Sequence, residues 1–294
     1  MRKGSYLWSL LYGLLLTAFS AYVLLDTFVI REVYTVEQPE ITEASEEPRE
    51  TILTENRYQD ENISITLMQY REYDSAVYVA DVVIASPEYL KTAFAQNAYG
   101  KNVTETTSQI ARENQAILAV NGDYYGSREA GYVLRNGTLY RETAFKNQED
   151  LVIWEDGSFS LVQEKTVSAS ELLAQGAVQI LSFGPGLVAE GEVCVTEAQE
   201  VGKAKASNPR TAIGFIEPLH YVFVVSDGRT EESAGLSLYE LACFLQSLGA
   251  VTAYNLDGGG SSVLYFNGEV VNNPTSNGKT IKERSVSDIV YIGY

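Results

Sequence analysis

Apolar and polar residues alternate in short runs along most of the chain after residue 60. The runs at 63–70 and 75–85 alternate clearly and are joined by a polar turn, which predicts two neighbouring strands. Asn-Gly dipeptides at 136–137 and 267–268 are typical of tight hairpin turns. Further strands are predicted at 116–120, 133–140, 151–154, 158–161, 180–187, 209–215, 221–225, 251–254, 263–266 and 286–292.

Four segments predict helices between these strands. The clearest is 238–248, where apolar residues recur at helical spacing and Gly249 follows as a typical helix end. The other predicted helices are 106–114, 170–174 with Ser170 as its cap, and a short one at 89–94. We therefore expect an α+β fold of mixed, mainly antiparallel twisted sheets with packed helices.

The N-terminal thirty residues have a different pattern. Arg2 and Lys3 precede an almost unbroken apolar run, and Tyr6–Leu25 alone would form a helix of about 30 Å, the thickness of a bilayer core. The positive end predicts a cytoplasmic tail at 1–5, an anchor at 6–30 and an extracytoplasmic remainder. A cleaved signal peptide is the alternative, because 18–20 resembles a cleavage site, but the apolar run continues beyond it.

Acidic residues dominate the next segment, 31–60, which holds nine acidic and three basic residues and two prolines. Such a composition buries little apolar surface, so we expect a flexible stalk there. The domain proper is then 61–294. The net charge of −18 argues against binding to nucleic acid or to an anionic membrane surface. Cys194 and Cys243 leave one disulfide or two free thiols open, and His220 is interpreted as structural.

Carboxylate and amide side chains stand at the ends of several predicted strands. Asn121 and Asp123 follow one strand, and Asn255 and Asp257 follow another; residues two apart in a strand face the same side. Asp227 ends a third. These groups suit hydrogen bonding to sugar hydroxyls or acid–base chemistry, although turn-forming Asx residues look the same. The similar order of elements around the two pairs suggests an internal repeat that brings both pairs to one cleft.

A glycine-rich loop, Gly258–Gly260 with Ser261 and Ser262, follows the second pair. Glycine permits positive φ and close approach of a ligand, and the loop N–H groups can bind an anion. The bland alternative is a plain hairpin between 251–254 and 263–266. Arg210 and Arg229 are candidates for binding phosphate, and Tyr124 for packing on a sugar ring. Oxygen ligands of this kind also fit Ca²⁺, but the spacing of an EF-hand is absent.

These motifs together resemble the phosphodiester glycosidase family. The resemblance covers roughly 105–294 and leaves out the anchor and the stalk. It is carried by NGDYYG (121–126), FGPGL (183–187), NPRTAIG (208–214), SDGR (226–229), NLDGGGSSVLYFNG (255–268) and ERSVSDIVYI (283–292).

The resemblance implies hydrolysis of a sugar-1-phosphodiester at the anomeric carbon, acting on envelope or exopolysaccharide glycans, without a required cofactor. It implies Asp123, Asp227 and Asp257 as catalytic residues, with their roles unassigned. The implied substrate-binding residues are Asn121, Arg210, Arg229, Asn255, Gly258, Gly259, Gly260, Ser261 and Ser262. Tyr124 is added to this set from its own chemistry, as a ring that can pack on a sugar. A non-catalytic glycan-binding or assembly protein, and a phosphodiesterase that cuts the P–O bond, remain alternatives.

Overall fold

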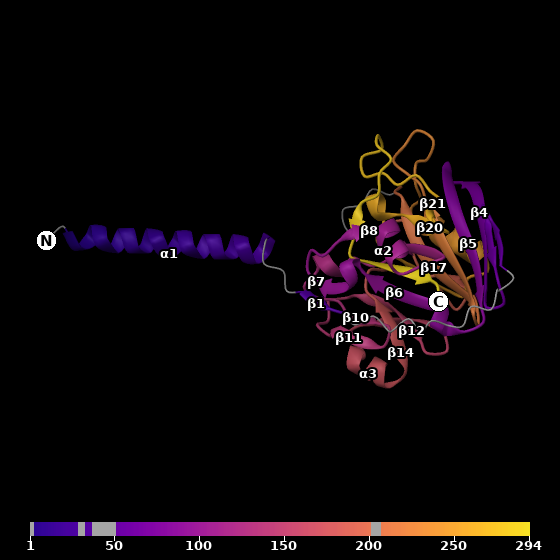
Figure 1. The fold of residues 1–294 in the computed structure, drawn as a ribbon, viewed down its shortest axis with the longest axis horizontal. Helices are drawn as coiled ribbons and strands as arrows, with labels where there is room; N and C mark the ends of the chain where they lie inside the picture. The colour runs from indigo at the N-terminus through magenta and orange to yellow at the C-terminus, as the bar shows by residue number, and fades with distance from the viewer. Residues whose placement is uncertain (1–2, 29–32, 37–50, 201–206) are drawn as a thin grey trace.

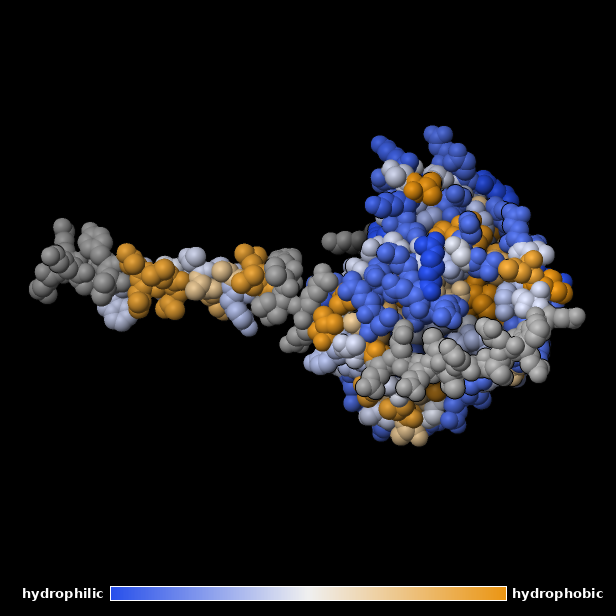
Figure 2. Space-filling view, in the orientation of Figure 1, coloured by the Kyte–Doolittle hydropathy of each residue, from blue (hydrophilic) through white to orange (hydrophobic). Residues whose placement is uncertain are grey.

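The computed structural model describes residues 3–28, 33–36, 51–200 and 207–294. Helix α1 (Lys3–Phe28) stands apart from a domain made of sheets (Figure 1). Its window Trp8–Leu25 has a mean hydropathy of 1.7, so it is apolar and long enough to cross a membrane. Figure 2 shows the apolar side chains on its surface, beside a domain whose visible face is mainly hydrophilic.

Part of the predicted stalk is strand. Strand β1 (Val33–Thr35) pairs with β7 (Ala98–Gly100), and β2 (Ile52–Thr54) forms a hairpin with β3 (Arg57–Gln59). The expectation of a flexible stalk through residue 60 is therefore wrong for these three strands. The prediction rested on the low apolar content of the segment. Strands at the edge of a sheet are held mainly by backbone hydrogen bonds, so they can form without many buried apolar side chains. The rest of the segment that precedes β2 lies outside the described residues, apart from Val36.

The largest sheet has nine strands, and neighbouring strands in it are antiparallel throughout. Its order is β16 (Glu192–Val193), β15 (Gly186–Ala189), β19 (Thr252–Asn255), β17 (Arg210–Glu217), β18 (His220–Ser226), β5 (Ser75–Ile84), β4 (Ile63–Glu72), β3 and β2.

Two five-stranded antiparallel sheets complete the domain. One has the order β21 (Glu269–Val270), β20 (Leu264–Phe266), β9 (Leu118–Asn121), β23 (Asp288–Ile292) and β6 (Leu90–Phe94). The other has the order β11 (Thr138–Arg141), β10 (Val133–Arg135), β14 (Ala177–Leu181), β12 (Glu149–Trp154) and β13 (Phe159–Gln163). A small pair joins β22 (Ser285–Val286) to β8 (Glu105–Thr106), and short 3-10 turns lie at Pro87–Tyr89, Ala95–Asn97, Tyr125–Ser127 and Gly259–Ser261.

The main hydrophobic core lies where the three large sheets face one another. Val120, Ile153 and Phe223, one from each sheet, are at most 2% exposed within it. Helices α2 (Thr107–Glu113), α3 (Ala169–Ala174) and α4 (Leu238–Ser247) contribute to three further clusters with strands of these sheets. The predicted α+β class with mainly antiparallel sheets is confirmed.

Each of these three helices begins with a capping box. The cap of α3 is Ser168, whose hydroxyl accepts from the Glu171 N–H at 3.2 Å, and not the predicted Ser170. The predicted helix at 89–94 is also wrong, because Leu90–Phe94 is strand β6, paired along its length with β23. A five-residue segment of mixed polarity such as 90–94 fits either element until its partner strand is known.

The strands that flank the glycine-rich loop do not form a hairpin. Strand β19 lies in the nine-stranded sheet and β20 in a five-stranded one, so the loop crosses between sheets. The suggested repeat is matched in pairing only in part. Strands β10 and β20 each form a hairpin with the strand after their Asn-Gly turn, β11 and β21, but on the other side β10 pairs with β14 and β20 with β9. Cys194 and Cys243 are free thiols. His220 Nε2 lies 2.7 Å from Asp81 Oδ1, across two paired strands.

Candidate active site

The two strand ends that carry Asn-x-Asp meet in space, as predicted. The Asp257 N–H donates to the Gly122 carbonyl at 3.3 Å, and Asn121 Nδ2 donates to the Asp257 carbonyl at 2.6 Å. Asn121 Oδ1 accepts from Thr211 Oγ1 at 2.8 Å, and the residue is 0% exposed. The buried Asn121 side chain therefore links the two loops through its hydrogen bonds. It does not reach the surface, where a substrate-binding residue is expected to lie.

Asn255 occupies a similar buried position. Its side-chain Nδ2 donates to the Gly184 carbonyl at 2.8 Å, which ties the end of β19 to the FGPGL segment. It is 0% exposed, and its Oδ1 has no hydrogen-bond partner. The structure thus places Asn255 under the site and not at its surface.

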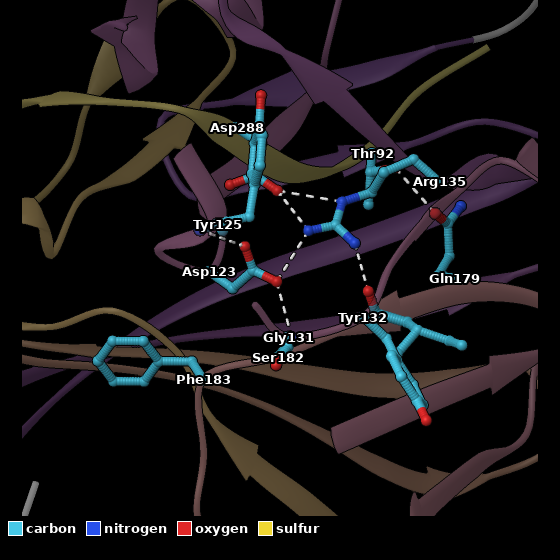
Figure 3. Close-up of polar contacts among 12 residues, drawn as sticks. Thr92, Asp123, Tyr125, Gly131, Tyr132, Arg135, Gln179, Ser182, Phe183 and Asp288 are labelled. Carbon is cyan, nitrogen blue, oxygen red and sulfur yellow. Dashed lines mark hydrogen bonds and ion pairs between the residues drawn. The ribbon is translucent and has the colours of Figure 1, made fainter. Parts of the chain in front are cut away.

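Asp123 belongs to a buried ion network (Figure 3). Arg135 Nη2 lies 2.8 Å from Oδ2 of both Asp123 and Asp288, and all three side chains are at most 2% exposed. Asp123 also accepts from the N–H groups of Tyr125 and Ser182, at 3.0 and 2.7 Å. Burial and the negative charge of Asp123 raise the pKa of Asp288 to about 8. Asp123 is therefore placed to fix two loops, not to meet a substrate.

Asp227 is also fully engaged. It is 4% exposed and accepts from the backbone and side chain of Asn273, at 2.9 and 3.1 Å, from Asn272 Nδ2 at 3.1 Å and from the Tyr78 hydroxyl at 3.3 Å. Burial and the Asp227 charge raise the pKa of Tyr78 to about 12. The carboxylate anchors the segment after β21 and does not line an open surface.

Asp257 is the one predicted catalytic carboxylate that remains partly exposed. Its Oδ1 accepts from the Gly258 N–H at 2.9 Å, and the Ser261 side chain also bonds to it. Burial raises the pKa of Asp257, and the positive charges of Arg284 and Arg128 oppose that rise. A carboxyl group with a raised pKa on a partly exposed residue is suited to acid–base or nucleophilic chemistry.

The glycines after Asp257 make room for two guanidinium groups. A Cβ on Gly259, where φ is +65°, would lie 2.7 Å from Arg229 Nη2. A Cβ on Gly260 would lie 2.9 Å from Arg284 Nη2. Only residues without side chains fit here, so glycine lets the two arginines lie directly against the loop.

Most backbone donors of the predicted anion nest already have acceptors within the protein. The N–H of Gly258 donates to Asp257, and that of Gly259 donates to the Pro209 carbonyl at 2.8 Å. The N–H groups of Ser261 and Ser262 bond within the loop, and both serines are at most 1% exposed. Four of the five N–H groups of the loop are therefore used to shape it.

Cationic side chains surround the Asp257 loop. Arg229 is exposed, and its Nη1 donates to the Ser276 carbonyl at 2.8 Å. Burial lowers the pKa of Arg229, and so do the charges of Arg284 and Arg210, which shows that the three guanidinium groups lie within electrostatic range of one another. Arg210 itself is 3% exposed and forms an ion pair with Glu200 at 2.7 Å, so it is a buried residue next to the site and not an exposed anion-binding group.

Arg128 and Arg284 are site residues that the sequence reasoning missed. Neither they nor Arg229 forms an ion pair with a carboxylate among the described residues. Their positions could have indicated them, because Arg128 directly follows NGDYYGS and Arg284 lies in ERSVSD, two of the motifs that carry the family resemblance. Tyr124 is 44% exposed on the same loop as Arg128, where a sugar ring can reach it.

Within the described part of the chain, no group of three or more His, Cys, Asp or Glu side chains is arranged to hold a metal ion. The deep cavity of about 950 Å³ lies elsewhere, beside β6 and β10, and its lining includes Arg135 but not Asp257. The chemistry of the predicted motifs therefore gathers at the Asp257 loop and outside that cavity.

The chain belongs to the phosphodiester glycosidase family, whose model matches residues 114–293. It is 34% identical over 187 residues to human N-acetylglucosamine-1-phosphodiester alpha-N-acetylglucosaminidase, covering 58% of this chain and 36% of the relative. It is 28% identical over 201 residues to an uncharacterised SPbeta prophage-derived protein of Bacillus subtilis, covering 67% of this chain and 31% of the relative. The chain thus spans about a third of the length of these curated relatives.

Solved structures share the fold. The zebrafish N-acetylglucosamine-1-phosphodiester alpha-N-acetylglucosaminidase catalytic domain matches with a TM-score of 0.62 at 20% identity, covering 90% of this chain and 89% of that one. A hypothetical protein from Synechocystis matches with a TM-score of 0.61 at 17% identity, covering 84% and 64%. Family membership supports hydrolysis of a sugar phosphodiester as the activity class.

Proposed function

We propose that this protein hydrolyses a sugar-1-phosphodiester, resembling a GlcNAc-1-phosphodiester, at the anomeric carbon. One observation carries the proposal: a partly exposed carboxylate, Asp257, stands on a loop against which Arg229 and Arg284 pack. In a chain with a net charge of −18, arginines without carboxylate partners among the described residues mark a site for an anion. A phosphodiester beside a sugar satisfies both the cations and the carboxylate.

The reaction needs one accessible carboxylate and a cationic clamp. Water adds to the anomeric carbon, the bond from that carbon to the phosphate oxygen breaks, and the phosphomonoester leaves. Arg229 and Arg284 stabilise the charge that grows on the departing phosphate, which needs little protonation. Asp257 either activates the water or attacks the carbon directly, and Tyr124 packs on the sugar.

The setting we propose is the outer face of a membrane. Helix α1 serves as an uncleaved anchor, and the domain acts outside the cytoplasm on envelope or exopolysaccharide glycans. The length and hydropathy of α1 support the anchor. The positive residues before it support the orientation. No divalent cation is required in this proposal.

The test is turnover of UDP-GlcNAc by the full chain in detergent, followed as release of GlcNAc. Asp257→Asn is expected to lower kcat by at least about 100-fold, a loss typical of removing a catalytic group. Arg284→Gln is expected to raise KM and lower kcat, because it weakens binding of the phosphate group in both the ground state and the transition state. Arg57→Gln, on the distant β3, is the matched control and should leave turnover unchanged.

Solvent labelling separates the proposed reaction from cleavage of the P–O bond. In ¹⁸O water, attack on the anomeric carbon leaves the phosphate product unlabelled, whereas attack on phosphorus labels it. Labelled phosphate would replace the proposal with the phosphodiesterase alternative. Unchanged turnover in a folded Asp257→Asn variant would remove Asp257 from the mechanism.

A non-catalytic glycan-binding protein is the second candidate. It is favoured by the burial of Asp123 and Asp227, which leaves only one of the three predicted catalytic carboxylates exposed. Binding of a sugar phosphodiester without turnover, lost equally in Asp257→Asn and Arg284→Gln, would support this candidate.

A further inference from the structure

A short connection ties the domain to α1. Helix α1 ends at Phe28 and β1 begins at Val33, so five Cα steps of 3.8 Å limit their separation to about 19 Å. A domain of the size of 61–294 has a radius of gyration of about 18 Å. A tether about as long as this radius keeps the edge formed by β1 and β7 close to the membrane whenever α1 spans it.

The strand β7 also contacts the loop that carries Arg128. The Tyr99 ring stacks on Tyr125 with centroids 5.3 Å apart, and the Asn102 N–H donates to the Gly126 carbonyl at 3.1 Å. A salt bridge between Lys101, which follows β7, and Glu129, which follows Arg128, adds to the same contact. The tethered edge and the site loop are therefore neighbours, and Figure 1 shows β1 and β7 at the end of the domain nearest α1.

Exposed apolar side chains lie on and beside this edge. Val33 and Tyr34 on β1 are 45% and 61% exposed, and Tyr124 on the site loop is 44% exposed. Phe145 is 46% exposed and lies 5.9 Å from the Arg128 guanidinium carbon. Aromatic side chains favour the interface between lipid and water, where the ring is buried and the hydroxyl stays wet.

We propose that the substrate is a sugar-1-phosphodiester whose phosphate is esterified to a lipid in the same membrane. The proposal rests on the hydrolase function proposed above. Water adds to the anomeric carbon, the carbon–oxygen bond to phosphate breaks, the free sugar departs, and the lipid phosphate monoester stays in the bilayer. The short tether holds the Tyr124 and Arg128 side of the site at the depth of the lipid phosphate. Net attraction does not hold it there, because the domain and anionic lipid have the same sign of charge.

Activity of the reconstituted full chain provides the first test. Phosphatidylcholine vesicles would carry the enzyme together with GlcNAc-1-phosphate esterified to hexadecanol, and UDP-GlcNAc would serve as the soluble substrate. The variant carries forty Gly/Ser residues inserted after Arg31, a flexible linker of roughly 35 Å root-mean-square length. We expect at least a fivefold loss of turnover on the lipid substrate and no change on UDP-GlcNAc.

The outcomes separate the two proposals. If the unmodified chain cleaves UDP-GlcNAc but not the lipid substrate, or if the insertion leaves lipid turnover unchanged, the inference about the membrane is overturned and the hydrolase function stands. If the unmodified chain cleaves neither substrate, the hydrolase function fails and the inference fails with it. Loss of α1 by cleavage, seen by N-terminal sequencing of the cell-surface protein, would also overturn the inference.

A second measurement does not depend on activity. In a chain with Cys194 and Cys243 replaced by serine, a fluorophore is attached at Ser127→Cys on the site loop, or at Glu55→Cys between β2 and β3. Both positions are exposed. Lipids with nitroxide headgroups should quench the label at 127 at least twofold more than the label at 55. Equal or reversed quenching would contradict the proposed orientation.

Discussion

Replacing Arg135 with methionine tests the buried ion network most directly. The guanidinium lies between two carboxylates, at 2.8 Å from Oδ2 of each, and it also donates to the Leu134 carbonyl at 3.1 Å. Removing one partner of a buried ion pair costs about 3–5 kcal/mol, because the other charge is left in a medium of low polarity. At roughly 2–4 °C per kcal/mol, the melting temperature should fall by about 6–20 °C.

The assay is thermal unfolding of the full chain in detergent, followed by tryptophan fluorescence at pH 5 and pH 8. The loss should be larger at pH 8, where Asp288 must either ionise without a counter-charge or hold its proton against the pH. A melting temperature within about 3 °C of wild type at pH 8, or equal losses at both pH values, would refute the reasoning about charge.

Asp288→Asn is the matched variant, because it keeps the shape of the side chain and cannot ionise. The pKa of Asp288 rises from 3.8 to about 8 in the folded protein, so its protonated form is favoured there. The stability that Asp288 contributes is fully present below pH 3.8 and is lost as the pH rises towards 8. The variant should therefore show a flatter pH profile of the melting temperature over this range.

Three smaller predictions concern the loop, a helix cap and metals. Gly259→Ala should lower kcat/KM at least tenfold with a folded protein, because alanine is strained at a φ of +65° and displaces Arg229; kinetics that match wild type would contradict this. Ser168→Ala should cost about 0.5–2 kcal/mol in denaturant unfolding and Ser170→Ala clearly less, and the reverse order would show that the cap is misassigned. Turnover should be unchanged after dialysis against EDTA, whereas activity restored only by Ca²⁺ would establish a metal site.

The sequence predicted local structure well where a local rule decides it. Asn136 and Gly137 have φ values of +49° and +76°, so the chemistry of this dipeptide alone specifies the turn. Helix α4 was predicted from its spacing and begins with a capping box at Ser237. Strand β6 was not predicted, because its five residues of mixed polarity become a strand only through pairing with β23.

The sequence predicted which loops form the candidate site, but not which of their side chains are exposed and which are buried. The meeting of the loops at Asn121 and Asp257 was expected from the repeated motif. The roles of Asp123 and Asp227 were not, because an aspartate at a strand end looks the same in sequence whether it faces solvent or an internal partner. The partner Asp288 lies 153 residues from Arg135, and such pairings arise only from the tertiary fold.

The glycine-rich loop has a consequence for the cohesion of the domain. Its two ends belong to different sheets, and the amide of Asn121 fastens it to a strand of one of them. Local opening of the loop therefore releases the hydrogen bond that links the end of β9 to the segment after β19. A ligand that binds at Asp257 stabilises the closed arrangement by a free energy that grows with the logarithm of its concentration over its Kd, and so it slows amide hydrogen exchange in both sheets at once. Ligand binding at the surface is therefore thermodynamically linked to the closed state of the loop that connects the two sheets.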